Sequence, residues 1–198
     1  GLGVRVVATN NVHYHVPERH RLQDALVAIR HNKTLEETHR ERRPNAHFYL
    51  KSPRQMAALF KGIPEAIDNS ARIAEDAADA ATQAATESTI ALLSYSPDTV
   101  EQQLGAARNL LTGEFQQSYT DLTTDVVIPG AKEQQIAALA SVPAAAPVSA
   151  DPEHAVVLLF VNQTVTVGQQ PPTDTASSVR VTLDKVDGRW LISAFDPV

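Results

Sequence analysis

The fold is decided by the stretch Glu153–Val198, which reads EHAVVLLFVNQTVTVGQQPPTDTASSVRVTLDKVDGRWLISAFDPV. Within it, Asp187-Gly188 predicts a two-residue type I′ turn, because that turn requires positive φ at both positions. A two-residue loop also fixes the register of the flanking strands. The predicted pairs are Val186 with Arg189, Lys185 with Trp190, Leu183 with Ile192, and Val181 with Ala194.

The predicted hairpin has one apolar and one polar face. The apolar face consists of Val181, Leu183, Trp190, Ile192 and Ala194. The polar face carries Arg180, Thr182 and Asp184, a pattern typical of a sheet with one side in water. We therefore expect Trp190 to be a core residue.

Two further strands are predicted before the hairpin. Ala155–Val167 begins as a continuous apolar run and alternates from Val161 onward. The linker Gly168–Ser177 is too polar and proline-rich for a strand interior. Gln134–Val148 is expected to be an edge strand, because an edge tolerates its two prolines, Pro143 and Pro147.

Helical patterns precede these strands. An alanine-rich helix is expected from Glu75-Asp76, since alanine is the best helix former. Ser96-Pro97-Asp98 predicts the next helix start, with Ser96 as the cap. Two apolar stripes follow: Val100, Leu104, Ala107 and Leu111, and then Phe115, Tyr119, Leu122 and Val126. Thr112-Gly113 separates them, and Pro129-Gly130 is expected to end the helical part. Helices followed by about four antiparallel strands predict an α+β domain.

The charge of the chain changes sharply along its length. Residues 1–75 carry 12 Lys and Arg against 8 Asp and Glu, whereas residues 76–198 carry 5 against 15. We therefore expect two domains with these bounds. The acidic second part argues against nucleic-acid binding, because phosphate contacts need a basic surface. The absence of cysteine excludes disulfides and thiolate metal sites. No apolar run is long enough to predict a membrane span, and no signal-peptide pattern indicates secretion.

Short elements are predicted in residues 1–75. They are a buried strand at Val4–Thr9 and helices starting at Pro17, Ser52-Pro53 and Pro64. The apolar helix faces are Leu22, Ala25, Leu26 and Ile29; Met56, Leu59 and Phe60; and Ala66, Ile67, Ser70 and Ile73. The basic run Arg40-Glu41-Arg42-Arg43 is expected to be a solvated loop.

A first resemblance is carried by residues 4–75, through VVATNNVHYHVPERHRLQDALVAIRHNKTLEE and HFYLKSPRQMAALFKGIPEAIDNSARIAE. They resemble the end of the PHP (polymerase and histidinol phosphatase) domain of error-prone C-family bacterial DNA polymerases. The family's Asp-x-His metal motif aligns with Asn11-Val12-His13, where Asn11 offers a poorer ligand than a carboxylate. His13 and His15 would share one face of a strand, but two imidazoles do not complete a metal site. The resemblance therefore implies a PHP fragment without an intact metal site.

A second resemblance is carried by residues 76–198, through SYSPDTVEQQLGAARNLLTGEFQQSYTDLTTDVVIPGAKEQQI, HAVVLLFVNQTVTVG and the ending VDGRWLISAFDPV. They resemble the Mce-associated (mammalian cell entry) proteins of actinobacteria. The resemblance implies a curved antiparallel sheet with helices, cone-shaped as in nuclear transport factor two, on the extracytoplasmic side of the cell membrane. It also implies an accessory role in envelope lipid import, with Mce-complex proteins as partners. Here a polymerase-like segment replaces the family's membrane helix, as in a gene fusion or an engineered chimera.

An enzymatic role would need a carboxylate or histidine inside the cone. The candidates are Tyr119, Asp121, Asp125 and His154. Asp121 and Asp125 share a helix face away from the apolar stripe, so we expect them in solvent, and His154 lies at a strand start. We therefore expect no catalytic, cofactor or metal site. The expected binding surface is the polar sheet face, Asn162–Thr166 with Arg180 and Thr182, and an ordinary solvated face is the alternative.

Overall fold

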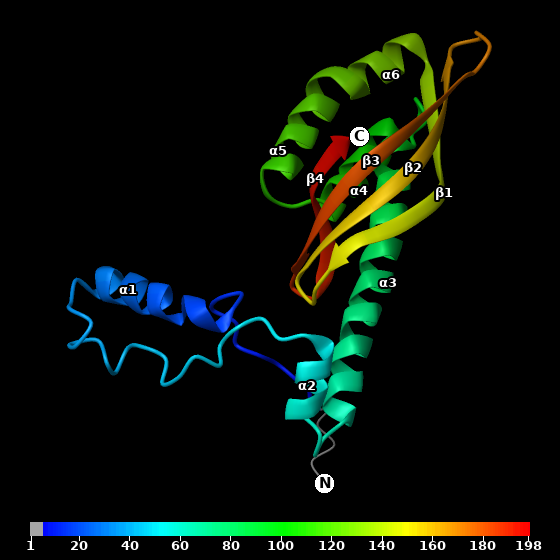
Figure 1. Cartoon of the computed structure of the whole chain (residues 1–198). Coiled ribbons are helices and arrows are strands. Elements are labelled where there is room, and N and C mark those ends of the chain that lie inside the picture. Colours follow the sequence, from blue (N-terminus) through cyan, green and yellow to red (C-terminus); the bar gives the residue numbers. More distant parts are fainter. Residues whose placement is uncertain (1–5) are drawn as a thin grey trace. The chain divides into compact units, whose positions relative to one another are not determined.

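The computed structural model describes residues 6–198 (Figure 1). The chain forms two compact units, of which the first ends at Arg72 and the second comprises Ile73–Val198. Helix α3, Glu65–Leu93, runs through this boundary. The two helices expected to start at Pro64 and at Glu75-Asp76 are therefore one, because no glycine or proline interrupts the alanine-rich stretch. Among the described residues, no helix is both long and apolar enough to cross a membrane.

The first unit begins with short helices: η1 (Pro17–Arg19), α1 (His20–His31) and α2 (Pro53–Leu59). The predicted starts at Pro17 and Ser52-Pro53 are confirmed. At α2, Ser52 and Gln55 form a capping box, in which each side chain accepts a hydrogen bond from the other residue's backbone N–H.

The strand predicted at Val4–Thr9 is wrong where the structure describes it. Residues 6–9 have no regular structure, and residues 4 and 5 lie outside the described part. Val6 is 50% exposed. The backbone here bonds to α3 instead, since the N–H of Ala8 donates to the Ala66 carbonyl oxygen at 3.0 Å and to Ser70 Oγ at 2.9 Å.

The apolar face predicted for α1 forms no core. Leu22 is 51% exposed, Leu26 is 52% exposed and Ile29 is 73% exposed, and Ala28 is the buried residue of this helix. Helical spacing identified the helix correctly. It did not predict burial, which requires a second layer to pack against the apolar face.

The second unit contains one antiparallel sheet in the order β1-β2-β3-β4, whose strands are long and curved (Figure 1). The strands are β1 (Ile136–Ala150), β2 (His154–Val167), β3 (Thr173–Val186) and β4 (Arg189–Pro197). As predicted, the proline-containing strand lies at the edge. Its register with β2 shifts between Ser141 and Ala144 and again after Pro147, where proline cannot donate a ladder hydrogen bond.

The hairpin of β3 and β4 follows the prediction and then departs from it. Positive φ angles of 50° at Asp187 and 79° at Gly188 confirm the turn. The pairs are confirmed as far as Leu183 with Ile192. A bulge then shifts the register, so that Ala194 pairs with Thr182 and Phe195 pairs with Val181. The predicted pairing of Val181 with Ala194 is therefore wrong, and Phe195 takes the place of Ala194 on the core face.

The linker between β2 and β3 is shorter than predicted. Strand β3 begins at Thr173, and residues 173–177 pair with the end of β2 although all five are exposed. Backbone pairing continues the hairpin beyond the core here, and Thr164 Oγ1 donates a side-chain hydrogen bond to Asp174 Oδ1 at 2.6 Å. A polar composition is consistent with such a strand, so the prediction of an irregular Gly168–Ser177 holds for residues 168–172 and is wrong for residues 173–177.

The helices before the sheet also depart locally from the prediction. They are α4 (Val100–Ala107), η2 (Arg108–Leu110), α5 (Gly113–Leu122), the π-helical segment η3 (Thr123–Val127) and α6 (Ile128–Gln134). Helix α4 starts after Thr99, later than predicted from Ser96-Pro97-Asp98. Pro129 does not end the helical part, because it lies in the first turn of α6, where proline's missing N–H is tolerated.

The core of the second unit lies between α3 and the inner face of the sheet. Alanines of α3 (Ala77, Ala81, Ala85) pack there with strand residues that include Val157, Leu159, Val181, Leu183 and Ile192. Trp190 is 9% exposed, which confirms it as a core residue. The predicted stripe Val100, Leu104, Ala107 and Leu111 is also buried.

Candidate apolar binding cavity

The second unit contains a half-open cavity of about 320 Å³ between its helices and its sheet. The end of α3, helices α4 and α5, segment η3 and the inner face of β2 and β4 form its wall. The lining residues are Leu92, Leu93, Tyr95, Leu104, Phe115, Tyr119, Leu122, Thr123, Val127, Gln163 and Phe195. The volume lies at the lower end of the range for small-molecule sites.

Three polar side chains in this wall donate hydrogen bonds to the backbone. The Tyr119 hydroxyl donates to the carbonyl oxygen of Leu92 at 3.2 Å, and Gln163 Nε2 donates to that of Leu93 at 3.2 Å. Thr123 Oγ1 donates to the Tyr119 carbonyl oxygen at 2.7 Å. The bonds from Tyr119 and Gln163 hold the end of α3 against α5 and β2, and the surface toward the cavity is mostly apolar.

The π-helical segment decides which side chains of this region point inward. Regular helix spacing predicted Leu122 and Val126 on the inward stripe, but Val126 is 61% exposed and Leu122 is 56% exposed. One additional residue per turn in η3 brings Thr123 and Val127 inward instead. Leu122 contributes to the cavity wall from its exposed rim, whereas Val126 lies outside it.

Tyr119 is the candidate acid or base that lies in the cavity wall. Burial raises the pKa of its phenol, and the neighbouring Tyr95 adds to the rise. The phenol therefore stays protonated at neutral pH and donates a hydrogen bond. This is the state of a structural hydroxyl and not of a general base.

The other three candidates lie outside the cavity. Asp121 is exposed and accepts a hydrogen bond from Gln117 Nε2 at 2.7 Å, and Asp125 is exposed as predicted. His154 lies at the start of β2, where its Nδ1 is 2.7 Å from Asp184 Oδ1. The structure therefore does not bring Asp121, Asp125 and His154 together.

A second hollow, of about 380 Å³, shares Tyr95 with the apolar cavity. Its polar lining is Ser94, Ser96, Gln103, Thr164 and Thr166, and its apolar lining comes from the start of β1. Tyr95 is fixed between the two spaces, because its N–H and carbonyl both bond to Ala138 at 2.9 Å. Sequence reasoning missed Tyr95, whose role depends on this isolated bridge between distant parts of the chain.

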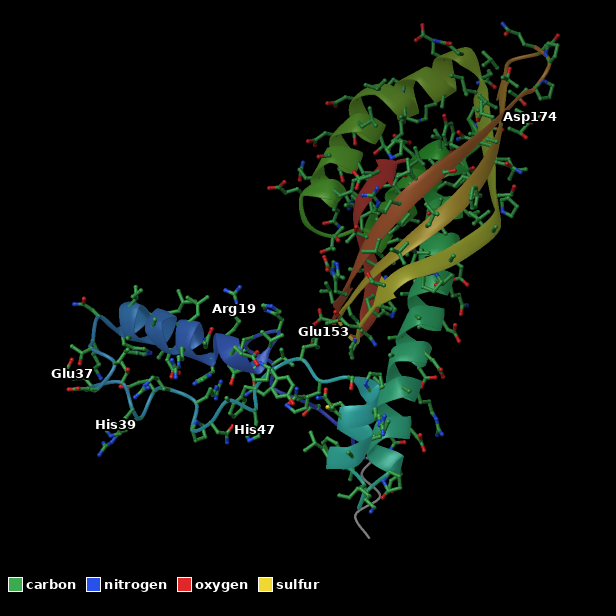
Figure 2. All side chains as sticks on the ribbon, in the orientation of Figure 1. Arg19, Glu37, His39, His47, Glu153 and Asp174 are labelled. Atoms are coloured by element: carbon green, nitrogen blue, oxygen red, sulfur yellow. The ribbon has the colours of Figure 1, made fainter. Side chains whose placement is uncertain are left out.

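The histidine expected to match a metal motif, His13, makes other contacts in the first unit. Arg43 Nη2 lies 2.7 Å from His13 Nε2, and Phe48 packs edge-on against the same ring. His15 and Asn11 are exposed. His39 and His47, labelled in Figure 2, lie along the connection between α1 and α2. Within residues 6–198 no three His, Asp or Glu side chains are grouped closely enough to hold a metal ion.

The outward face of the sheet is less polar than predicted. Asn162 and Arg180 are exposed on it, but the centre of β2 adds Val156, Leu158 and Phe160, and Phe160 is 50% exposed. The continuous apolar run that starts at Ala155 was the sequence signal for this stripe, since a strand that is apolar on both faces does not alternate.

Comparisons with known proteins separate the two parts of the chain. No protein-family model matches it. The chain is 47% identical over 73 residues to error-prone DNA polymerase 1 of Agrobacterium fabrum, but this match covers 37% of the chain and 7% of the polymerase. So short a match says nothing about polymerase activity in this chain.

Two solved structures share the fold at low sequence identity. An IcmL-like type IV secretion system protein from Legionella pneumophila aligns with a TM-score of 0.51 at 12% identity, over 59% of this chain and 88% of that one. A periplasmic fragment of TraM also aligns with a TM-score of 0.51, at 13% identity, over 60% of this chain and 95% of the fragment. The predicted cone-shaped α+β fold, as in nuclear transport factor two, is confirmed.

The match to one relative covers most of that relative's length. The chain is 59% identical over 131 residues to outer membrane protein Rv1973 of Mycobacterium tuberculosis, a match that covers 66% of this chain and 82% of the relative. The chain therefore belongs to the family of this mycobacterial outer membrane protein.

Proposed function

We propose that the chain is a non-enzymatic binding protein of the bacterial cell envelope, and that it acts as an accessory to an Mce-type lipid-import complex. The family membership supports the envelope role. The observation that carries the binding role is the lining of the apolar cavity, which contains no Asp, Glu, His, Lys or Arg. Its phenols, Tyr95 and Tyr119, both have a pKa raised by burial. Such a wall can hold an apolar group but provides no general base at neutral pH.

The outward sheet face is the surface that we expect to contact the partner protein. Phe160 is half exposed at its centre, between Ala144 of β1 and Ser178 of β3. With Leu158 beside it on the same face of β2, this half-exposed aromatic ring offers an apolar anchor for a partner.

Affinity capture from an actinobacterial envelope extract tests this proposal. The parent chain is expected to capture Mce-complex proteins. Phe160→Glu is expected to abolish capture, because a charge would replace the apolar anchor. Thr175→Glu, on the exposed extension of β3, is the matched control and should capture normally. Failure of the parent chain to capture any Mce-complex protein would contradict the accessory role.

A second candidate function concerns the first unit alone. Its identity to error-prone DNA polymerase makes it a candidate PHP fragment. We propose that this fragment has no metal-dependent activity, because Arg43 bonds to the only histidine that matches the family's motif.

A further inference from the structure

We propose that the apolar cavity binds an uncharged molecule with a hydrocarbon body of about ten to twelve carbon atoms and one oxygen atom that accepts a hydrogen bond from Tyr95. The ligand would lie entirely on the inner side of the sheet, within this one cavity. The inference rests on the proposed binding function and names the class of ligand for its cavity.

The lining of the apolar cavity suits a hydrocarbon body. Leucines from α3, α4 and α5 and the stacked rings of Phe115 and Phe195 form most of the wall. Contact with these side chains would remove apolar ligand surface from water, which is the main driving force for binding in a site of this kind.

The volume of the cavity sets the size of the ligand. At about 320 Å³, the cavity is roughly twice as large as an apolar protein cavity of about 150 Å³ that binds benzene. Scaling from the six-membered ring of benzene gives a body of about ten to twelve carbon atoms. Because the cavity is half-open, one end of the ligand would lie at the mouth, beside the exposed side chain of Leu122.

One hydroxyl in the wall has a proton to offer to a ligand. The hydroxyls of Tyr119 and Thr123 donate to carbonyl oxygens of the protein. The Tyr95 hydroxyl differs, because it donates to no group among residues 6–198, and burial raises its pKa so that it stays protonated. Tyr95 also raises the pKa of Tyr119, which requires the two phenols to lie close together in the wall. A ligand oxygen would satisfy this remaining donor.

Backbone hydrogen bonds hold Tyr95 at the cavity. Its N–H and its carbonyl oxygen both bond to Ala138 of β1 at 2.9 Å, in an isolated bridge between distant parts of the chain. A donor whose main chain is already fixed loses less conformational freedom when a ligand binds.

The same wall disfavours a charged ligand. It contains no charged side chain that could pair with one, so a buried carboxylate or ammonium would lose its hydration without gaining an ionic partner. Outside the wall, Asp121 precedes the rim residue Leu122, and residues 76–198 carry an excess of acidic side chains. This negative charge repels anions from the mouth.

The aromatic side chains do not form a cage for a cation. In such a cage, the faces of several rings surround an ammonium group. Here Phe115 and Phe195 stack on each other with ring planes inclined by 6°, so each ring turns one face toward the other ring. Leucine side chains form the neighbouring wall. An uncharged hydrocarbon body matches this lining better than a cation does.

Calorimetric titration of the full chain tests the ligand class. The neutral probes are 1-decanol and 1-naphthol, which offer an aliphatic and an aromatic body with one hydroxyl. The charged probes are decanoate and decyltrimethylammonium, each kept below the concentration at which it forms micelles.

We expect saturable one-to-one binding of at least one neutral probe, and affinities at least about tenfold weaker for both charged probes. The tighter of the two alcohols identifies the body as a chain or a fused ring, and either supports the proposal. No saturable binding of either alcohol, or equal or tighter binding of a charged probe, would overturn it.

Two neighbouring valines test the location. Val127 lines the cavity, whereas Val126 is 61% exposed and lies outside it. Val127→Phe places a ring in the cavity and is expected to weaken binding of the tighter alcohol at least about tenfold. Val126→Phe adds the same ring outside the cavity and should leave binding unchanged. Circular dichroism checks that both variants fold, and equal affinities of the two folded variants would overturn the location.

Tyr95→Phe tests the hydrogen bond, because it removes only the hydroxyl. It should weaken binding of the tighter alcohol about fivefold, the equivalent of one hydrogen bond. Tyr119→Phe is the matched control and should change the affinity less than about twofold, since the Tyr119 proton is donated to Leu92. Equal weakening by the two variants would overturn the role of Tyr95.

The same measurements separate this inference from the proposed function. Capture of Mce-complex proteins by a chain that binds neither alcohol would contradict only the inference. Binding of an alcohol by a chain that captures no Mce-complex protein would support the inference and contradict only the accessory role.

Discussion

Phe195 of β4 stacks on Phe115 of α5, with ring centroids 6.1 Å apart and ring planes inclined by 6°. The bulge in β4 produces this contact, because it places Phe195 opposite Val181 on the core face. Both rings line the apolar cavity. The stack therefore joins the last strand to the helix that closes the cavity.

Replacement of Phe195 by alanine should remove this link. We expect a loss of about 2–3 kcal/mol in the free energy of unfolding, below the range of a fully buried phenylalanine because Phe195 is only partly buried. Urea unfolding followed by Trp190 fluorescence measures it. Phe160→Ala is the control and should cost less than about 1 kcal/mol, since Phe160 is half exposed. Equal losses for the two variants would contradict the role of the stack.

Trp190 should make one of the larger contributions to the stability of the sheet. Trp190→Ala is expected to cost roughly 3–5 kcal/mol, because the ring is 9% exposed and packs in the main core. Circular dichroism during urea unfolding measures this loss without relying on the tryptophan. A loss below about 1 kcal/mol would show that the ring contributes little to packing.

The sequence predicted the sheet best where local chemistry decides geometry. Asp187-Gly188 fixed the turn and the first pairs, and proline placed β1 at the edge. The bulge was not predictable, because it depends on the packing of Phe195 against a helix that is distant in the sequence. The π-helical segment was missed for a similar reason: nothing in the spacing of Leu122 and Val126 indicates that tertiary packing will favour Thr123 and Val127.

The candidate site was predictable only in outline. An apolar cavity was consistent with the stripes on α4 and α5, and the exposure of Asp121 and Asp125 was predicted from helix periodicity. Tyr95 was not identified, since its position depends on two backbone bonds to Ala138 that no local pattern encodes. Apolar periodicity in α1 likewise predicted a buried face that the structure leaves exposed.

The pair of His154 and Asp184 should give a small acid-dependent contribution to stability. The hydrogen bond from His154, and then that from Ser193, lowers the pKa of Asp184 below its ordinary value of 3.8. A carboxyl whose pKa is lower in the folded state stabilises the fold above the unfolded-state pKa. This contribution is lost as the pH falls through the folded-state pKa.

Asp184→Asn should therefore reduce stability at pH 7 by less than about 1 kcal/mol, because the side chain is 44% exposed and solvent screens the pair. The difference from the parent chain should shrink as the pH falls below 3.8. Urea unfolding at pH 7 and at pH 2.5 measures both values. If the difference in unfolding free energy grows on acidification, the prediction is contradicted.

The first unit should bind no transition metal tightly. Asn11 offers an amide, a poorer metal ligand than a carboxylate, and the guanidinium of Arg43 contacts Nε2 of His13. Calorimetric titration with zinc or manganese should show no stoichiometric submicromolar site. His13→Ala is the control, and a tight site that this variant removes would contradict the prediction.

The second unit should fold without the first. Its core, its cavity and its sheet all lie within Ile73–Val198, and α1 exposes its apolar face. We expect a fragment of residues 73–198 to unfold within about 4 °C of the full chain, equivalent to roughly 1 kcal/mol. Fluorescence of Trp190, the single tryptophan, reports on this unit in both proteins. Ile29→Glu in the full chain is the control and should leave the transition unchanged.

Limited proteolysis should cut first between residues 40 and 76 or in the turn after β2. A resistant core that lacks the hairpin of β3 and β4, or a fragment that fails to fold, would contradict an independent second unit.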